Sequence, residues 1–159
     1  MVGGAEADGH TLPGLRMVRL PARPAWLGLI LVGGSFGTAL RAWLENDFGS
    51  PPGEWPWVTL WINLGGSLIL GGVLEGLAGT GPDRGWRRGA RLGFGTGLLG
   101  GFTTYSTFSV EVVQLFRSGV WLVAVGYALV SVVGGVLAAF GAIWTVRRLV
   151  RRWRAGGAR

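Results

Sequence analysis

One stretch in the middle of the chain, residues 93–111, combines glycine, hydroxyl and carboxylate groups within an otherwise apolar sequence. It reads GFGTGLLGGFTTYSTFSVE. A helix that crosses hydrocarbon must satisfy its own backbone, and the pair Gly100–Gly101 followed closely by two threonines predicts a break in the helix there. Carbonyls freed at such a break are hard oxygen ligands, which suit a small hard cation. The stretch therefore predicts an ion site at membrane depth.

A polar stripe lies in the preceding apolar segment, where Thr59, Asn63 and Ser67 recur at every fourth residue. On a helix this spacing places the three side chains on one face. Hydrogen bonding between helices and the lining of a pore explain the stripe equally well. An amide at mid-depth is the most expensive of these groups to bury, so Asn63 is the residue for which we predict a functional role.

Aromatic rings follow the predicted break. If the helix resumes after Thr104, then Tyr105, Phe108 and Glu111 share one face because they lie three residues apart. Aromatic pairs at this spacing usually pack in a core, but here a glutamate lies on the same face. The last apolar segment adds a stripe of Tyr127 and Ser131. Ring edges are weakly positive, so rings, hydroxyls and an amide together favour an anion path beside the cation site.

The segments that must position these groups are four apolar runs. Charged residues make up only 14% of the 159 residues, and a helix of about 20 apolar residues crosses roughly 30 Å of hydrocarbon. We therefore predict an all-α membrane protein with four transmembrane helices, the third of them broken, at about residues 25–44, 56–78, 92–116 and 120–146. A polar leader, residues 1–24, precedes them, and a basic tail, residues 147–159, follows.

Other features of these segments indicate packing and topology. Gly33 and Gly37 lie four residues apart, which is typical of close helix packing. Arg41, near the end of the first run, is expected either to extend to the membrane interface or to attract anions at a vestibule. Residues 45–54 are expected to form a solvated loop because Pro51 and Pro52 prevent regular structure there.

The residues exclude several classes of function. There is no cysteine, and the single histidine lies in the leader. No set of nucleophile, base and orienting group can be assembled, so we predict that the chain is not an enzyme. A small multidrug exporter would need a carboxylate in the first run, and residues 25–44 have none. A non-transporting membrane scaffold would use the glycines but would leave Asn63 and Glu111 without a purpose.

Three motifs resemble the Fluc/CrcB family of bacterial fluoride channels. GGSFGTALRAWL is similar to the family's first-helix pattern GGxxGAxxRY, and WVTLWINLGGSLILG is similar to TLxVNxxGSFxLG. GFGTGLLGGFTTYSTFSVE is similar to GxxGGxTTFSTFSxE. The resemblance covers about residues 29–147, with Tyr105 where the family has phenylalanine and Gly135 where it often has a hydroxyl.

The resemblance implies a four-helix subunit that assembles as an antiparallel dimer with two fluoride pores and a central sodium ion that is not transported. The backbone carbonyls of Gly100 and Thr103 from both subunits would bind this sodium. It further implies passive export of fluoride from the cytoplasm, which lowers its toxicity. The residues that would line the fluoride path are Asn63, Tyr105, Thr107, Phe108, Glu111, Tyr127 and Ser131, with Arg41 at the vestibule.

Arginines are distributed unevenly along the chain. Thirteen lie in the leader, the loop between the second and third runs, and the tail, whereas only Arg41 and Arg117 lie beside the opposite loops. By the positive-inside rule both termini of this multi-pass plasma-membrane protein are cytoplasmic. An antiparallel homodimer needs a sequence that inserts both ways. The arginine bias therefore predicts that this chain forms a dimer with a paralogous subunit of opposite orientation. The alternative is that two copies of this chain pair with each other.

Overall fold

The computed structural model describes residues 24–156, and this part of the chain contains helices and connecting loops but no strand. The predicted leader, apart from Pro24, and residues 157–159 of the predicted tail lie outside the described residues. The helical elements are α1 (Pro24–Phe48), α2 (Trp57–Thr80), α3 (Trp86–Ala90), η1 (Arg91–Leu99), α4 (Gly100–Phe102), α5 (Tyr105–Arg117) and α6 (Trp121–Gly156).

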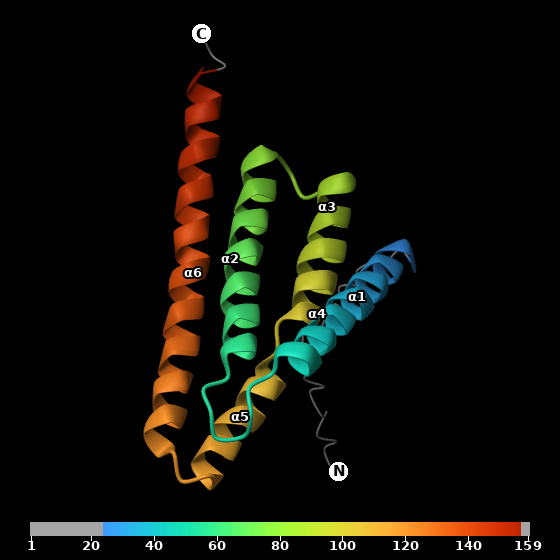
Figure 1. Ribbon diagram of the computed structural model, residues 1–159. Coiled ribbons are helices and arrows are strands. Elements are labelled where there is room, and N and C mark those ends of the chain that lie inside the picture. Colours follow the sequence, from blue (N-terminus) through green and yellow to red (C-terminus); the bar gives the residue numbers. More distant parts are fainter. Residues whose placement is uncertain (1–23, 157–159) are drawn as a thin grey trace, which may run out of the picture.

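The helices form an elongated bundle (Figure 1). Helices α2 and α6 run side by side, and α3, η1 and α4 form one column next to α2. Helix α1 packs obliquely on this column, and α5 contacts the first part of α6. The loop between α2 and α3 lies at the same end as the C-terminal part of α6, whereas the α1–α2 and α5–α6 connections lie at the other end. Two arginine-rich regions therefore share one end of the bundle.

Three helices, α1, α2 and α6, are long and apolar enough to cross a membrane. Their outward surfaces carry large apolar side chains, including Val32 at 72% exposure and Leu122 at 68%. Such a surface is unfavourable in water and fits contact with lipid. The prediction of an all-α, multi-pass membrane protein is thus confirmed.

Glycines bring α1 unusually close to the π-helical segment η1. A Cβ atom added at Gly97 would lie 2.8 Å from the Ile30 carbonyl oxygen and 3.2 Å from the Gly33 Cα. On the α1 side, Gly33 and Gly37 likewise face backbone atoms of residues 93–102. This confirms the packing role expected from their spacing. Without side chains between them, α1 can place Arg41 against the column.

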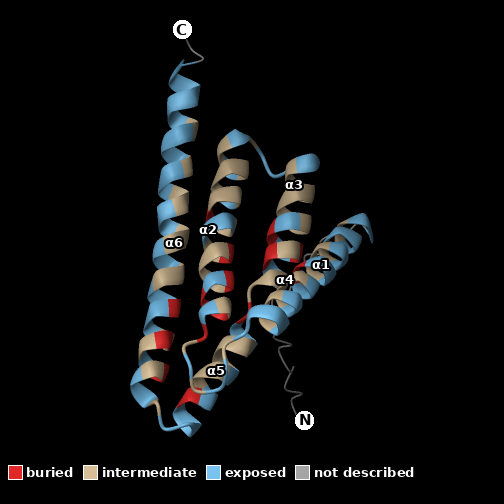
Figure 2. Cartoon of the chain, viewed as in Figure 1, coloured by how far each residue is buried: buried red, intermediate tan, exposed pale blue. Residues whose placement is uncertain are grey.

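One cluster of buried hydrophobic residues lies where α2, α5 and α6 meet, and further buried residues lie on η1 and along α2 (Figure 2). Leu60, Leu115, Ala124 and Tyr127 form this cluster, and Tyr127 and Ala124 are fully buried. Trp55 covers it with its ring centroid 5.9 Å from that of Tyr127, edge to face. The cluster fixes α5 against α2 and α6, and so positions the residues that follow the break-prone stretch.

Two helices extend beyond their expected ends. Helix α1 continues to Phe48, so Glu45 is helical and not part of the expected solvated loop. No glycine or proline occurs between Leu44 and Phe48, and Arg41 pairs with Glu45 four residues later, which favours continuation. Helix α6 continues through the basic segment to Gly156, because arginine is a good helix former.

The close approach of α1 and η1 yields a stability prediction. Gly97→Ala should lower the free energy of unfolding by about 1–3 kcal/mol, because its methyl group would overlap backbone that cannot move aside. The matched control is Gly34→Ala, whose Cβ would lie 3.8 Å from its nearest neighbour, the Gly97 carbonyl oxygen. Thermal unfolding in detergent compares the two variants. Equal unfolding midpoints for Gly97→Ala and Gly34→Ala would contradict the packing described.

Candidate functional site

The chain path is interrupted between α4 and α5. Helix α4 ends at Phe102, and Thr103 and Thr104 are extended, with φ/ψ of −75°/152° and −143°/125°. Asn63 of α2 bonds to the peptide groups of Thr104 in both directions. Its Nδ2 donates to the Thr104 carbonyl oxygen at 2.9 Å, and its Oδ1 accepts from the Thr104 N–H at 2.8 Å. The side-chain amide thus supplies the partner that the Thr104 N–H lacks between the two helices, and gives a second bond to the carbonyl at which α5 begins.

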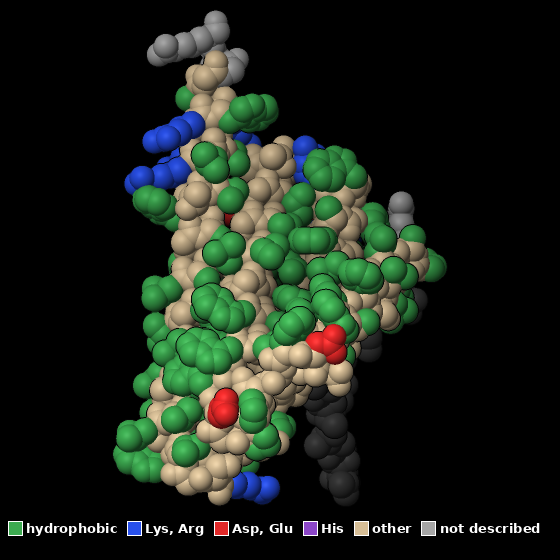
Figure 3. Space-filling model, in the orientation of Figure 1, with side chains coloured by type: hydrophobic (Ala, Val, Ile, Leu, Met, Phe, Trp, Pro, Cys, Tyr) green, Lys and Arg blue, Asp and Glu red, His purple; other side chains and the backbone are tan. Residues whose placement is uncertain are grey.

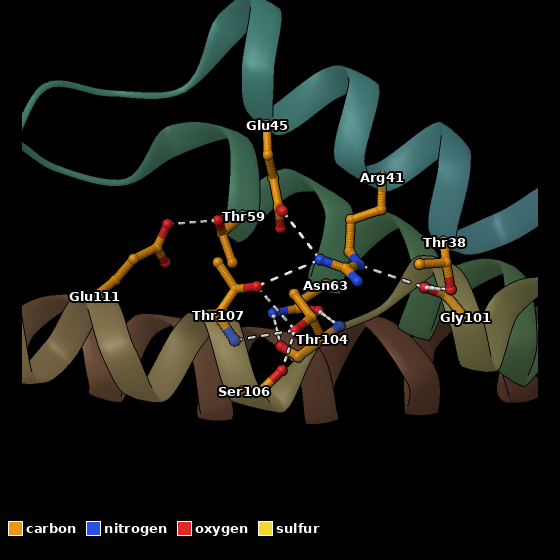
Figure 4. A network of polar contacts seen from close by, with 10 residues as sticks. All are labelled: Thr38, Arg41, Glu45, Thr59, Asn63, Gly101, Thr104, Ser106, Thr107 and Glu111. Carbon is orange, nitrogen blue, oxygen red and sulfur yellow. Dashed lines mark hydrogen bonds and ion pairs between the residues drawn. The ribbon is translucent and has the colours of Figure 1, made fainter.

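Thr104 also begins the next helix. Its Oγ1 accepts from the Thr107 N–H at 3.0 Å, which is the usual bond of a helix N-cap. The same hydroxyl lies 3.1 Å from the Thr107 Oγ1 and 3.2 Å from the Ser106 Oγ. Figure 4 shows these hydroxyls close together at the interruption that precedes α5. The sequence TTYST therefore both ends one helix and starts another.

Arg41 reaches the interruption from α1. Its Nε donates to the Gly101 carbonyl oxygen and its Nη1 to the Thr107 Oγ1, both at 3.4 Å. The Nη1 also pairs with the Glu45 carboxylate at 2.9 Å, and only 19% of the Arg41 side chain is exposed. Thr38 donates a further bond to the Gly101 carbonyl at 3.4 Å. Arg41 therefore points into the molecule and does not extend along the surface (Figure 4).

A second polar cluster lies farther along α5. Glu111 accepts a hydrogen bond from the Thr59 hydroxyl at 2.7 Å and one from the Tyr127 hydroxyl at 2.6 Å, so each carboxylate oxygen has a donor from a different helix. Thr59 and Tyr127 are 1% and 0% exposed. Short bonds of this kind to a carboxylate are strong and orient the donors. They tie α2, α5 and α6 together on one side of the interruption.

An open cavity of about 240 Å³ lies beside the interruption. The Phe108 ring lies between Tyr105 and Tyr127, with centroid separations of 5.9 and 5.4 Å. Tyr105 itself is 81% exposed on the isolated chain. The cavity lining mixes an amide, hydroxyls and ring edges, and consists of Asn63, Ser67, Thr103, Thr104, Tyr105, Phe108, Ser131 and Val132.

Most of the residues singled out in the sequence come together. Five predicted site residues line the cavity, namely Asn63, Thr103, Tyr105, Phe108 and Ser131, and so does Ser67 of the polar stripe. Glu111 and Tyr127 form the adjoining cluster, and Arg41 and Thr107 meet each other beside the interruption. Gly100 lies outside the cavity lining and is exposed. The functional role of each residue remains a prediction.

Several residues at the site were not among those predicted. Thr38 contacts the Gly101 carbonyl next to the interruption, and Glu45 pairs with Arg41. Thr104 lies at the centre of the interruption. The spacing of four between Arg41 and Glu45 could have indicated the ion pair. The spacing of three between Thr104 and Thr107 could have indicated the N-cap.

Comparison with known proteins gives consistent matches over the helical region. Residues 28–143 match the family described as CrcB-like protein, Camphor Resistance (CrcB). The fluoride-specific ion channel FluC 1 of Cutibacterium acnes is 48% identical over 128 residues, which are 80% of this chain and 90% of the relative. FluC of Hyphomonas neptunium is 44% identical over 123 residues, 76% of this chain and 94% of the relative. FluC of Leptospira interrogans serovar Lai is 38% identical over 122 residues, which are 75% of this chain and 92% of the relative.

The paired bonds of Asn63 predict a large effect of its removal. Asn63→Ala would leave the Thr104 N–H without its partner, at about 1–3 kcal/mol for a group left buried and unpaired, and would also remove one bond to the Thr104 carbonyl. We expect a clearly lower unfolding temperature in detergent. The control is Asn46→Ala, which removes only an exposed bond to Asp47. Equal unfolding temperatures for the two variants would show that Asn63 does not hold the interruption.

Proposed function

The chain belongs to the CrcB family of fluoride ion channels, and from this membership we propose that it is a fluoride-specific channel that exports fluoride passively from the cytoplasm. Channel families of this kind are not enzymes. The observation that carries the proposal is the cavity at the interruption, which offers amide, hydroxyl and ring-edge donors within the helical bundle. Such donors can replace the water of a small anion without the tight binding that a lysine or arginine in the path would produce.

The fluoride path we propose is the polar track predicted from the sequence. Moving a bare small ion into a low-dielectric medium costs tens of kcal/mol in an idealised estimate, so each lost water must be replaced. Asn63 uses one of its two amide N–H groups on the Thr104 carbonyl, and the other can donate to an anion in the cavity. Tyr105 and Phe108 present ring edges. The track continues through Thr107, Glu111, Tyr127 and Ser131.

The direction of flow follows from the membrane potential. With the cytoplasm negative, an anion leaving gains about 2.3 kcal/mol per 100 mV. No coupled energy source is needed for export. We propose that the chain lies in the plasma membrane with both termini in the cytoplasm, because the arginine-rich regions lie at one end of the bundle. Arg41 and its partner Glu45 would then lie toward the opposite side.

We also propose four membrane passages and an antiparallel dimer. The third passage would be the composite of α3, η1, α4 and α5, broken at Thr103 and Thr104. Two features support a second subunit: the cavity is open, and the Tyr105 ring is exposed. The arginine bias favours a paralogous partner of opposite orientation over a second copy of the chain.

A structural sodium ion fits the donors at the interruption. The carbonyls of the last turn of a helix lack helical partners and carry partial negative charge, which favours a cation. The resemblance to the fluoride-channel family implies that the carbonyls of Gly100 and Thr103 bind this sodium, and the Gly101 carbonyl already binds Arg41 and Thr38 instead. Two carbonyls are too few for one sodium ion, and the same pair from a second subunit would complete the shell. Bound sodium would supply fixed positive charge between the two anion paths.

The test is fluoride efflux from liposomes that contain the purified chain. We expect efflux with fluoride inside and no efflux with chloride inside, in sodium-containing buffer. The chain alone and the chain with a paralogous CrcB subunit from the same genome form the two arms. Efflux only with the paralogue supports the heterodimer, and efflux from the chain alone supports self-pairing.

Replacement of sodium by a large organic cation is a further arm of the same experiment. Efflux should fall if sodium holds the two subunits together. Fluoride efflux that persists without sodium would contradict the sodium site but not the channel. Absence of fluoride efflux in every arm, with correctly inserted protein, would contradict the proposed function.

A further inference from the structure

An open apolar groove runs between α2 and α6, on a part of the molecule that the fluoride path does not use. Its volume is about 520 Å³, and its walls include Leu68, Gly72, Leu137, Gly141, Thr145 and Val146. A Cβ atom added at Gly141 would meet no atom within 4 Å, so small residues hollow out this surface. The groove is wide enough to receive an apolar chain from the membrane.

The groove ends at the level of the membrane interface. Trp121 and Trp144 lie near the two ends of the apolar part of α6 and are exposed. A rise of 1.5 Å per residue separates them by roughly 35 Å, close to the hydrocarbon thickness. Tryptophan favours the head-group level, so residues 137–146 line the groove just inside the hydrocarbon and Arg147 onward lie at the phosphates.

Two arginines lie beyond the end of the groove, on the face of α6 that lines it. Arg148 lies seven residues beyond Gly141 and Arg152 seven beyond Thr145, which places them on the same helix face as those groove residues. Figure 3 shows arginine side chains gathered on the C-terminal part of α6, above an apolar region of the same helix. The Arg148 guanidinium lies over the Trp144 ring, 3.6 Å from its centroid. A basic rim therefore borders the apolar groove.

Three other arginines at this end of the bundle are already neutralised or occupied. Arg147 binds the Glu75 carboxylate at 2.8 and 3.1 Å, and Arg154 donates to the Gly79 carbonyl. Arg91 binds Asp83, and these bonds hold the pKa of the Asp83 carboxyl below its usual range. By contrast, Arg148 and Arg152 form no hydrogen bond or ion pair with another residue in the part of the chain that the structure describes.

We propose that this groove binds one anionic phospholipid. An acyl chain lies against Gly72 and Gly141, and the phosphate lies between Arg148 and Arg152. Charge complementarity selects this occupant, because basic sites at the end of a groove between membrane helices suit anionic head groups. In the orientation proposed above, the lipid comes from the cytoplasmic leaflet. The site is separate from the fluoride path, and only the choice of leaflet rests on the orientation proposed above.

The test is native mass spectrometry of the delipidated full-length chain, titrated with dioleoyl phosphatidylglycerol or dioleoyl phosphatidylcholine. We expect one phosphatidylglycerol to be retained and phosphatidylcholine to bind much more weakly. Arg148→Gln with Arg152→Gln should weaken retention roughly 30-fold, from about fivefold for each arginine near an anionic surface. Gly141→Leu should displace the lipid by filling the groove while leaving the helix intact.

Matched controls use the same substitutions elsewhere. Arg117→Gln removes an arginine from the opposite end, and Gly28→Leu fills open space on α1, where an added Cβ would also meet no atom within 4 Å. Neither should change retention. Equal binding of both lipids, or full retention by the double arginine variant, would overturn the proposal. The proposal would also be overturned if Gly141→Leu left lipid binding unchanged but abolished the dimer. That result would assign the groove to a second subunit. No fluoride is present, so the result is separate from the channel test.

Discussion

The paired hydrogen bonds between the Asn63 amide and the Thr104 peptide are the interaction on which the rest of the site depends. A backbone interruption inside a membrane protein leaves peptide groups without partners, and hydrocarbon cannot supply them. Asn63 bonds to both the carbonyl and the N–H of Thr104, at 2.9 and 2.8 Å. This allows α4 to end and α5 to begin within the bundle. A helix end and a helix start, with partial charges of opposite sign, are thereby placed next to each other.

Close packing of α1 against η1 gives the interruption its second support. Glycine contacts such as Gly33 with Gly97 let the backbones approach, so that Arg41 can reach the Gly101 carbonyl and the Thr107 hydroxyl. Glu45 neutralises much of the charge of this arginine at 2.9 Å. A positive charge near the interruption can therefore stabilise carbonyl and hydroxyl groups without acting as a trap for anions. The glycines that let α1 pack closely on η1 thus also determine where the charge of Arg41 lies.

The family, the helical class and the membrane character could all be predicted from the sequence, because motif spacing and apolar runs are local signals. The ends of α1 and α6 could not, since the charged residues after Leu44 and Val146 read equally well as solvated segments. The bonds of Glu111 to Thr59 and Tyr127 join three helices. Periodicity places each of these residues on a face of its own helix but does not say which faces meet. The sequence could not predict that the Arg41 side chain points into the molecule, for the same reason.

Selective, passive conduction of fluoride is the property that we propose for this fold. The most direct measurement is the reversal potential of bilayers that contain the chain, with its partner subunit where one is needed. Sodium is equal on both sides, and a tenfold fluoride gradient is balanced by a large impermeant anion. We expect a reversal potential near the fluoride equilibrium value, about 59 mV for a tenfold gradient of a univalent ion. A value near zero, or one that follows an added chloride gradient instead, would contradict it.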